Sequence, residues 1–322
     1  MVAEPRGGKF TRLCRALVWP LQARGDVVVM IDPDTAVSAW LARRVRRRIW
    51  VADVHEDYAA LLRDRAWVPR PLLRVLQGAV GVLNRLIASA DLVLVADEHV
   101  PPRRARRRRV MRNEPDFGLL PEPRAERADG PWRAVYIGDN RTSRGLRTMV
   151  EAVAATAGDD EPWVLDLVGP VAAADADWLA ERLTQPDATR IRTHGRLAPG
   201  LAWQVADGAD VGLCLLADTP AFREAMPSKV YEYLACGIPT IATPLPRVAE
   251  LVGRTGAGAV VGDVAATTEV LRRFATDAPF RQELTAAALE AARVARSRAN
   301  TYDQAAAEMA PLVHGKGGSG LS

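Results

Sequence analysis

The sequence is poor in the residues that build metal sites and disulfide frameworks. It has three cysteines and four histidines in 322 residues. Cys14, Cys214 and Cys236 stand far apart without a CxxC pair, so we expect free thiols in a reducing compartment. The histidines show no ligand spacing with one another or with the cysteines. A structural zinc site is therefore not expected.

Long apolar runs are also absent. Nowhere do roughly 18 apolar residues follow one another without interruption, which is the length that a membrane-spanning helix needs. Near the N-terminus, Pro20 and Arg24 cut the apolar stretch 16–19 well short of a signal-peptide core. These features predict a cytoplasmic protein.

The composition is that of a globular protein, with 48% hydrophobic and 25% charged residues. The net charge is only +4, but arginines gather in the segments 43–48 and 103–109. Two interpretations stay open for these runs: a solvated face, or peripheral contact with an anionic membrane. Because no aromatic residues interleave the second run and no nucleic-acid fold signature accompanies it, we expect no nucleic-acid partner.

The first part of the chain alternates apolar strands with amphipathic helices. Strands are predicted at 26–31, 49–54, 92–96 and 110–113, and helices at 10–21, 35–48 and 71–88. This alternation is typical of a doubly wound parallel sheet.

A second α/β set follows the segment 121–130, which lacks apolar periodicity and contains two prolines. Its strands are predicted at 134–137, 163–168, 191–193, 211–216, 240–243 and 259–261, and its helices at 144–155, 177–183, 231–236, 265–276 and 279–296. A helical segment 299–311 and a flexible GKGGSG tail end the chain. The expected domains are 1–120 and 131–298, with 299–322 as a C-terminal segment.

The segment 210–250 carries the most informative motif. After the apolar strand 211–216, a loop and a short helix place Glu224, Ser228 and Lys229 at the carboxyl end of the predicted sheet. Open α/β sheets bind ligands at that end. Pro227 suits a first helical turn, so the free N–H groups behind it could face a phosphate.

Glu224 and Glu232, separated by seven residues, are part of a larger pattern of residue types at fixed offsets. The other members are Pro227, Lys229, Tyr233, Ala235, Gly237, Pro239 and the closing 248–251. The pattern resembles the donor-site signature of the retaining GT-B glycosyltransferases of family 4. The resemblance implies two Rossmann-like, doubly wound parallel-sheet domains facing a cleft. Family members usually begin with a strand and a Gly-rich loop, whereas this chain opens on a helix, so a shortened N-terminal domain is expected.

On this resemblance, Glu232 would accept hydrogen bonds from both ribose hydroxyls of the nucleotide, because a carboxylate offers two acceptor oxygens. Glu224 would contact the hexose. The alternatives are a solvated helix glutamate and an exposed loop carboxylate, respectively.

The resemblance also implies a diphosphate site. A diphosphate leaving group must be neutralised by a metal or by fixed cations. Arg144, in the loop that begins at Gly138, and Lys229 are the candidates for fixed cations. Asp139 stands where the family usually has an arginine, and Arg141 could supply the missing charge. No metal or other cofactor is expected.

Four further residues complete the implied site. His55 follows a strand of the first domain and resembles the acceptor-facing histidine of the family; Asp57 is a weaker acceptor-side candidate that could instead cap the next helix. Arg196 and Leu197 resemble the loop near the nucleotide base. The usual proposal for the family is front-face substitution, in which the leaving phosphate oxygen takes the acceptor's proton.

Two D-x-D pairs, Asp32 with Asp34 and Asp175 with Asp177, could bind a divalent ion in a GT-A transferase. The motif is short and frequent by chance. Asp177 is instead interpreted as a helix N-cap, and Asp32 and Asp34 as the end of a strand.

The leading hypothesis is a bacterial, retaining, metal-independent glycosyltransferase. It would move a sugar from UDP-hexose or UDP-N-acetylhexosamine to a hydroxyl acceptor. The alternatives are a UDP-sugar epimerase on the same fold and a nucleotide-sugar-binding pseudoenzyme.

Overall fold

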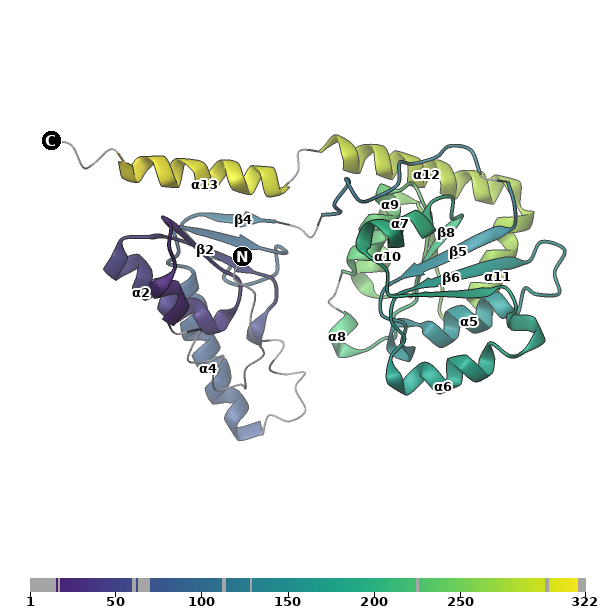
Figure 1. The fold of residues 1–322 in the computed structure, drawn as a ribbon, viewed down its shortest axis with the longest axis horizontal. Helices are drawn as coiled ribbons and strands as arrows, with labels where there is room; N and C mark the ends of the chain where they lie inside the picture. The colour runs from purple at the N-terminus through teal and green to yellow at the C-terminus, as the bar shows by residue number, and fades with distance from the viewer. Residues whose placement is uncertain are drawn as a thin grey trace. The chain divides into compact units, whose positions relative to one another are not determined.

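The computed structural model describes residues 16, 18–59, 62, 70–111, 114–127, 129–223, 226–298 and 301–317. It divides into two compact units (Figure 1). Unit 1 comprises Met1–Asn113 and Ala299–Ser322, and unit 2 comprises Glu114–Arg298. The segment 299–322, expected to stand apart, is therefore grouped with the N-terminal unit.

Unit 1 contains a four-stranded, all-parallel sheet in the order β1-β2-β3-β4. Its strands are β1 (Val27–Met30), β2 (Ile49–Val54), β3 (Leu92–Val95) and β4 (Arg108–Val110). The helices α2 (Ala36–Arg46) and α4 (Arg70–Ile87) pack on one face of the sheet, and α13 (Thr301–Gly317) packs on the other. A short 3-10 turn, η1 (Pro33–Thr35), precedes α2.

Helix α13 is anchored to unit 1 by apolar and polar contacts. Ala305 is buried against β2 and β3, with Met309 and Leu312 beside it. Arg109 of β4 donates to Gln304 (2.8 Å) and also pairs with Glu308. The helix continues to Gly317, so the predicted end of this helix at residue 311 was wrong, and the first residues of the predicted GKGGSG tail are helical.

Unit 2 contains a six-stranded, all-parallel sheet in the order β10-β9-β8-β5-β6-β7. Its strands are β5 (Trp132–Ile137), β6 (Trp163–Val168), β7 (Ile191–Gly195), β8 (Val211–Cys214), β9 (Thr240–Ala242) and β10 (Gly258–Val260). From β5 the chain first moves toward β7 and then returns to β8 on the other side of β5. The direction of winding therefore reverses between β5 and β8, and this sheet is doubly wound.

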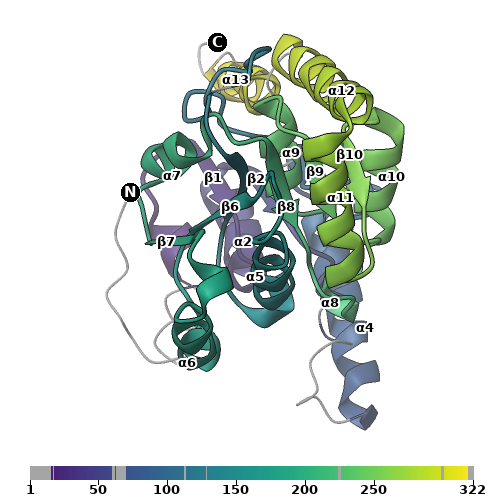
Figure 2. The same cartoon turned by 90° about the vertical axis from the view of Figure 1, so that its right-hand side faces the viewer.

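Helices cover both faces of the second sheet. They are α5 (Leu146–Ala154), α6 (Ala173–Arg182), α7 (Pro199–Ala206), α8 (Pro220–Arg223), α9 (Ser228–Ala235), α10 (Pro246–Thr255), α11 (Val264–Thr276) and α12 (Ala278–Ser297), with 3-10 turns η2 (Thr142–Arg144) and η3 (Pro186–Ala188). Helices α5, α6 and α11 share one core cluster with the sheet, α7, α9 and α10 pack on its other face, and α12 contributes residues to both sides. Figure 2 shows α5 and α11 side by side.

The start of α6 corrects one prediction. The helix begins at Ala173 with Ala172 at the N-cap, so Asp177 lies inside the helix and is not its cap. Asp175, in the first turn of the same helix, accepts a hydrogen bond from the backbone N–H of Thr142 (2.9 Å). Its carboxylate is thus used to hold the loop after β5.

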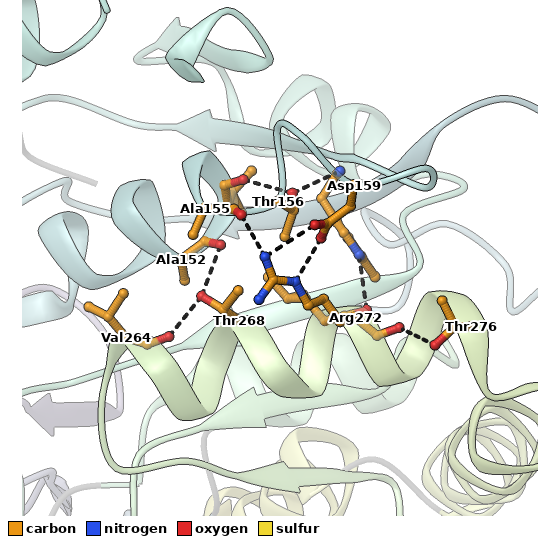
Figure 3. Close-up of polar contacts among 11 residues, drawn as sticks. Ala152, Ala155, Thr156, Asp159, Val264, Thr268, Arg272 and Thr276 are labelled. Carbon is orange, nitrogen blue, oxygen red and sulfur yellow. Dashed lines mark hydrogen bonds and ion pairs between the residues drawn. The ribbon is translucent and has the colours of Figure 1, made fainter. Parts of the chain in front are cut away.

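Side chains of α11 satisfy carbonyl groups at the end of α5 (Figure 3). The last turn of a helix leaves carbonyls without helical donors. Thr268 Oγ1 lies 3.2 Å from Ala152 O, and Arg272 donates to Ala155 O (2.9 Å) and pairs with Asp159. These contacts join two helices that are far apart in the sequence.

Thr268→Val is expected to lower the free energy of unfolding by about 1–2 kcal/mol without a large change in volume. It removes a buried hydroxyl that lies 2.9 Å from Val264 O of its own helix and 3.2 Å from Ala152 O of α5. Thr276→Val is the matched control, because the Thr276 hydroxyl bonds only to Arg272 O of its own helix at an exposed position. For the control we expect a change of about 0.5 kcal/mol or less. Denaturant titration of both variants is the measurement, and equal losses would contradict this role for Thr268.

Candidate functional site

The candidate residues of unit 2 gather where the winding of its sheet reverses. Strands β5 and β8 are neighbours, and the loops that follow them lead to different helices. Gly145 lets the first loop lie against the second: its φ is 87°, and an added Cβ would lie 2.2 Å from Leu215 O. Ala217 N also donates to Ser143 O (3.0 Å). Doubly wound sheets generally bind ligands at this edge.

Two cations converge there. Arg144 ends the 3-10 turn η2, and Lys229 lies in the first turn of α9. Lys229 is only 8% exposed, and the Nε of Arg144 is buried. Within the described part of the chain, neither side chain has an ion-pair partner. By contrast, Arg133 pairs with buried Asp166 at 2.9 Å.

Tyr136 lies between these cations, and sequence reasoning missed it. The Nζ of Lys229 is 5.3 Å from the centroid of the Tyr136 ring, and the Arg144 guanidinium lies near the phenol. Burial raises the pKa of Tyr136 to about 12, so the phenol is neutral and donates to Asp139 O (3.1 Å). A Cβ added at Gly138 would come within 3.4 Å of the Lys229 Nζ, so glycine leaves room beside the ammonium group.

Positive charge gathers at this site without a close ion pair. Burial lowers the pKa of Lys229 and the charge of Arg144 lowers it further, while the more distant charges of Glu232 and Asp139 oppose this shift. The nearby Cys214 thiol offers no compensating charge at neutral pH, because burial raises its pKa to about 11. Helix α9 adds the positive end of its dipole, since no side chain caps its N-terminus. A buried charge without a counter-ion is costly, so this arrangement indicates a site for an anion.

Pro227 occupies the N-cap of α9 in an extended conformation. It was expected inside the first turn, so that prediction was wrong by one position. The free N–H groups at the helix start remain, because a helix N-terminus leaves its first donors without intrahelical acceptors.

Glu232 lies one turn beyond Lys229 on α9. The Oγ of Ser228 donates to its Oε2 at 3.4 Å, which is a long contact. Burial raises the pKa of Glu232, and the charge of Lys229 opposes that rise. The two carboxylate oxygens therefore stay available as strong hydrogen-bond acceptors near the cationic pair.

The loop after β5 contains a second arginine with a different environment. Arg141 forms an ion pair with Asp139 at 2.6 Å, and both side chains are exposed. The charge of Arg141 is therefore balanced within the loop. That Arg141 supplies charge to the site stays a prediction.

The remaining predicted residues are more dispersed. Glu224 lies outside the described residues. Arg196 is exposed and Leu197 half-buried, both just after β7. In the same region the structure reveals an unpredicted contact, in which His194 Nε2 lies 2.8 Å from Asp166 Oδ1.

His55 and Asp57 belong to unit 1, at the carboxyl end of β2. The Nε2 of His55, which is largely exposed, lies 3.1 Å from Asp53 Oδ2. Asp57 accepts from the backbone N–H of Ala59 (2.9 Å), as expected for a residue that starts a helix. Their role toward an acceptor stays a prediction.

In the described ranges, no three His, Cys, Asp or Glu side chains are grouped so that they could hold a metal ion. Of the D-x-D residues, Asp175 is engaged by Thr142 and Arg147. Among the described helices, none is long and apolar enough to cross a membrane.

A separate cavity of about 410 Å³ lies at the opposite end of the unit 2 sheet. Its lining includes the segment 236–239, which precedes β9, and Asp210, which precedes β8. Two of its arginines are paired with carboxylates, Arg124 with Asp207 and Arg127 with Asp210. The charged residues at the carboxyl edge are therefore not part of this cavity.

Two all-parallel sheets, the N-terminal one smaller, define the GT-B class of fold. Residues 132–277 match the family Glycosyl transferases group 1. The matched segment lies within unit 2, which is therefore similar to the glycosyltransferases of this group.

Solved structures agree with the fold assignment. Sucrose-phosphate synthase from Thermosynechococcus elongatus has a TM-score of 0.66 and 17% identity, covering 97% of this chain and 80% of its own. Anabaena HepE, in complex with UDP and glucose, has a TM-score of 0.64 and 18% identity, covering 95% and 83%. WaaG, a glycosyltransferase of lipopolysaccharide biosynthesis, has a TM-score of 0.54 and 14% identity, covering 91% and 93%. No curated protein sequence matches the chain.

Proposed function

We propose that the chain is a retaining glycosyltransferase that moves a hexosyl or N-acetylhexosaminyl group from a UDP-sugar to a hydroxyl acceptor. The observation that carries this proposal is the pair Arg144 and Lys229, which is partly buried, forms no ion pair in the described structure, and lies one turn from Glu232. A diphosphate supplies the missing negative charge. The choice of UDP draws on the Anabaena neighbour, whose structure contains UDP and glucose.

The proposed roles follow from the chemistry of each group. Arg144, Lys229 and the N-terminus of α9 neutralise the diphosphate as the bond between the sugar C1 and the phosphate oxygen breaks. Glu232 accepts from the ribose hydroxyls, Ser228 lies beside it, and Glu224 contacts the sugar. Gly138 leaves space beside the Lys229 ammonium, and Arg196 and Leu197 are assigned to the base.

In the transfer step, the acceptor oxygen forms a bond to the sugar C1 on the same face from which the leaving phosphate oxygen departs. The acceptor's proton goes to the departing phosphate oxygen, so both products are complete without an enzyme nucleophile. His55 and Asp57 are assigned to the acceptor side, where they would orient the incoming hydroxyl. Fixed cations can carry the leaving-group charge, so no metal is assigned to the step.

The test is an incubation of the full chain with UDP-glucose, UDP-N-acetylglucosamine or a GDP-sugar in the presence of a chelator. UDP release is followed with and without a panel of hydroxyl acceptors. We expect UDP release from a UDP-sugar, and retained anomeric configuration in the product by NMR. Binding without any release would instead favour a pseudoenzyme, and conversion of the donor into its 2-epimer would favour an epimerase.

A further inference from the structure

Helix α2 of unit 1 exposes an apolar stripe. Val37, Leu41 and Val45 are 46%, 36% and 72% exposed. They are spaced four residues apart and therefore lie on one side of the helix. The opposite side is formed by small residues such as Ala39 and Ala42, which are completely buried against the sheet. The larger apolar side chains of this helix thus point away from the core.

Cations flank this stripe without nearby acidic residues in the sequence. No Asp or Glu occurs between Asp34 and Asp53. Arg44 and Arg46 are exposed, and the Arg44 guanidinium lies 5.1 Å from the centroid of the Trp40 ring. A valine and leucine stripe bordered by arginines is typical of helices that lie at a membrane interface.

The neighbouring helix α4 also exposes apolar residues and arginines. It packs beside α2 on the same face of the sheet. Val75 and Val82, seven residues apart, are 67% and 64% exposed, and the exposed Arg74 and Arg85 accompany them. Residues 70–90 contain no acidic side chain. Two neighbouring helices therefore present valines and arginines on their outer sides.

The second arginine run has a different character. Arg108 donates to the backbone carbonyls of Pro102 (3.0 Å) and Glu98 (2.9 Å). Arg109 pairs with Glu308 of α13. Part of this run is thus engaged in structural contacts, and no stripe of exposed apolar residues accompanies it among the described residues.

We propose that the outer sides of α2 and α4 form a peripheral docking surface for a bilayer that contains anionic lipids. The exposed valines and leucine would enter the interface while the arginines contact the lipid phosphates. Charge complementarity selects the anionic leaflet, since each arginine near such a surface adds attraction. A nucleic acid fits less well, because its phosphates give no reason for an apolar stripe between the cations. This surface lies in unit 1 and its test does not depend on donor binding in unit 2.

The experiment is co-sedimentation of the full chain with vesicles of phosphatidylcholine, with and without phosphatidylglycerol. We expect binding only to vesicles that contain phosphatidylglycerol. Val37→Ser/Leu41→Ser/Val45→Ser is expected to weaken partitioning about tenfold or more, because exposed apolar side chains no longer leave water. Arg44→Gln/Arg46→Gln is expected to weaken it about thirtyfold.

Arg103→Gln/Arg104→Gln is the matched control, because it makes the same change of net charge at exposed positions of the other run. Circular dichroism establishes that every variant is folded. The proposal is overturned if the control loses as much binding as the α2 variants, if phosphatidylcholine vesicles bind equally well, or if the serine variant binds unchanged. It is also overturned if the full chain prefers an oligonucleotide to anionic vesicles, or if sedimentation reveals a dimer that the serine variant abolishes.

Discussion

Lys229→Met is expected to lower kcat/KM for the sugar donor by about 10²–10³-fold while leaving the ligand-free protein at least as stable. The lost catalysis follows from removal of a fixed cation that neutralises the leaving diphosphate. The stability follows from burial: Lys229 is 8% exposed, lies near Arg144 and has no ion-pair partner in the described structure. Methionine fits such a site without a charge, so we expect a gain of about 1–2 kcal/mol.

The effect of Lys229 on stability should also depend on pH in a defined direction. The lowered pKa of Lys229 means that, between that pKa and its ordinary value of 10.5, the unfolded chain binds more protons than the folded chain. The free energy of unfolding contributed by this group therefore rises with pH through that window. Lys229→Met should remove this slope. Thermal unfolding of both proteins at several alkaline pH values measures it.

Arg192→Met is the matched control, because Arg192 is an exposed cation on β7. It should leave both donor turnover and stability nearly unchanged. A Lys229→Met variant that loses several kcal/mol of stability would show that the lysine supports the fold, and its loss of turnover would then carry no information on the anion site.

Glu232→Ala is expected to weaken nucleotide binding by about two orders of magnitude, because hydrogen bonds to a charged acceptor contribute about 1.5–3 kcal/mol each. The test compares UDP with 2′-deoxy-UDP by calorimetry. The wild-type protein should prefer UDP, and the variant should bind both equally. The control is Glu250→Ala, an exposed carboxylate on α10. A variant that still prefers UDP would contradict the ribose contact.

The raised pKa of Glu232 adds a pH signature. Nucleotide affinity should fall as pH drops through this raised value, which is higher than for an ordinary glutamate at 4.5. For stability the sign is opposite to that of a paired carboxylate. The contribution of the protonated group is present below 4.5 and is lost as pH rises through the folded-state pKa. Glu232→Ala should abolish both dependences.

The sequence was most informative where burial is complete. Strands β2 and β6 begin and end at the predicted residues, because each is an apolar run enclosed on both faces. The short helix α7 was not predicted, because its eight residues are too few to give a clear apolar periodicity. The predicted start of α6 at Asp177 was wrong: the helix begins at Ala173, and the carboxylate of Asp175 bonds to the distant residue Thr142.

The candidate site was predictable only in part. Lys229 and Glu232 could be recognised because they belong to one short helix with a fixed spacing. Tyr136 could not, since a tyrosine in an apolar strand is indistinguishable from a core residue until Lys229 is brought next to its ring. The ion pair of Arg141 with Asp139 likewise depends on the conformation of a loop. Sequence spacing gives residues of one element, whereas partners from different elements require the fold.

The most direct test of the central claim is a calorimetric titration of UDP into the full chain in the presence of a chelator, beside Lys229→Met. An anion site built from Arg144, Lys229 and the start of α9 predicts binding to the wild-type protein and its loss in the variant. Equal binding to both proteins, or none to the wild type, would contradict the assignment of this edge of the sheet as the donor site.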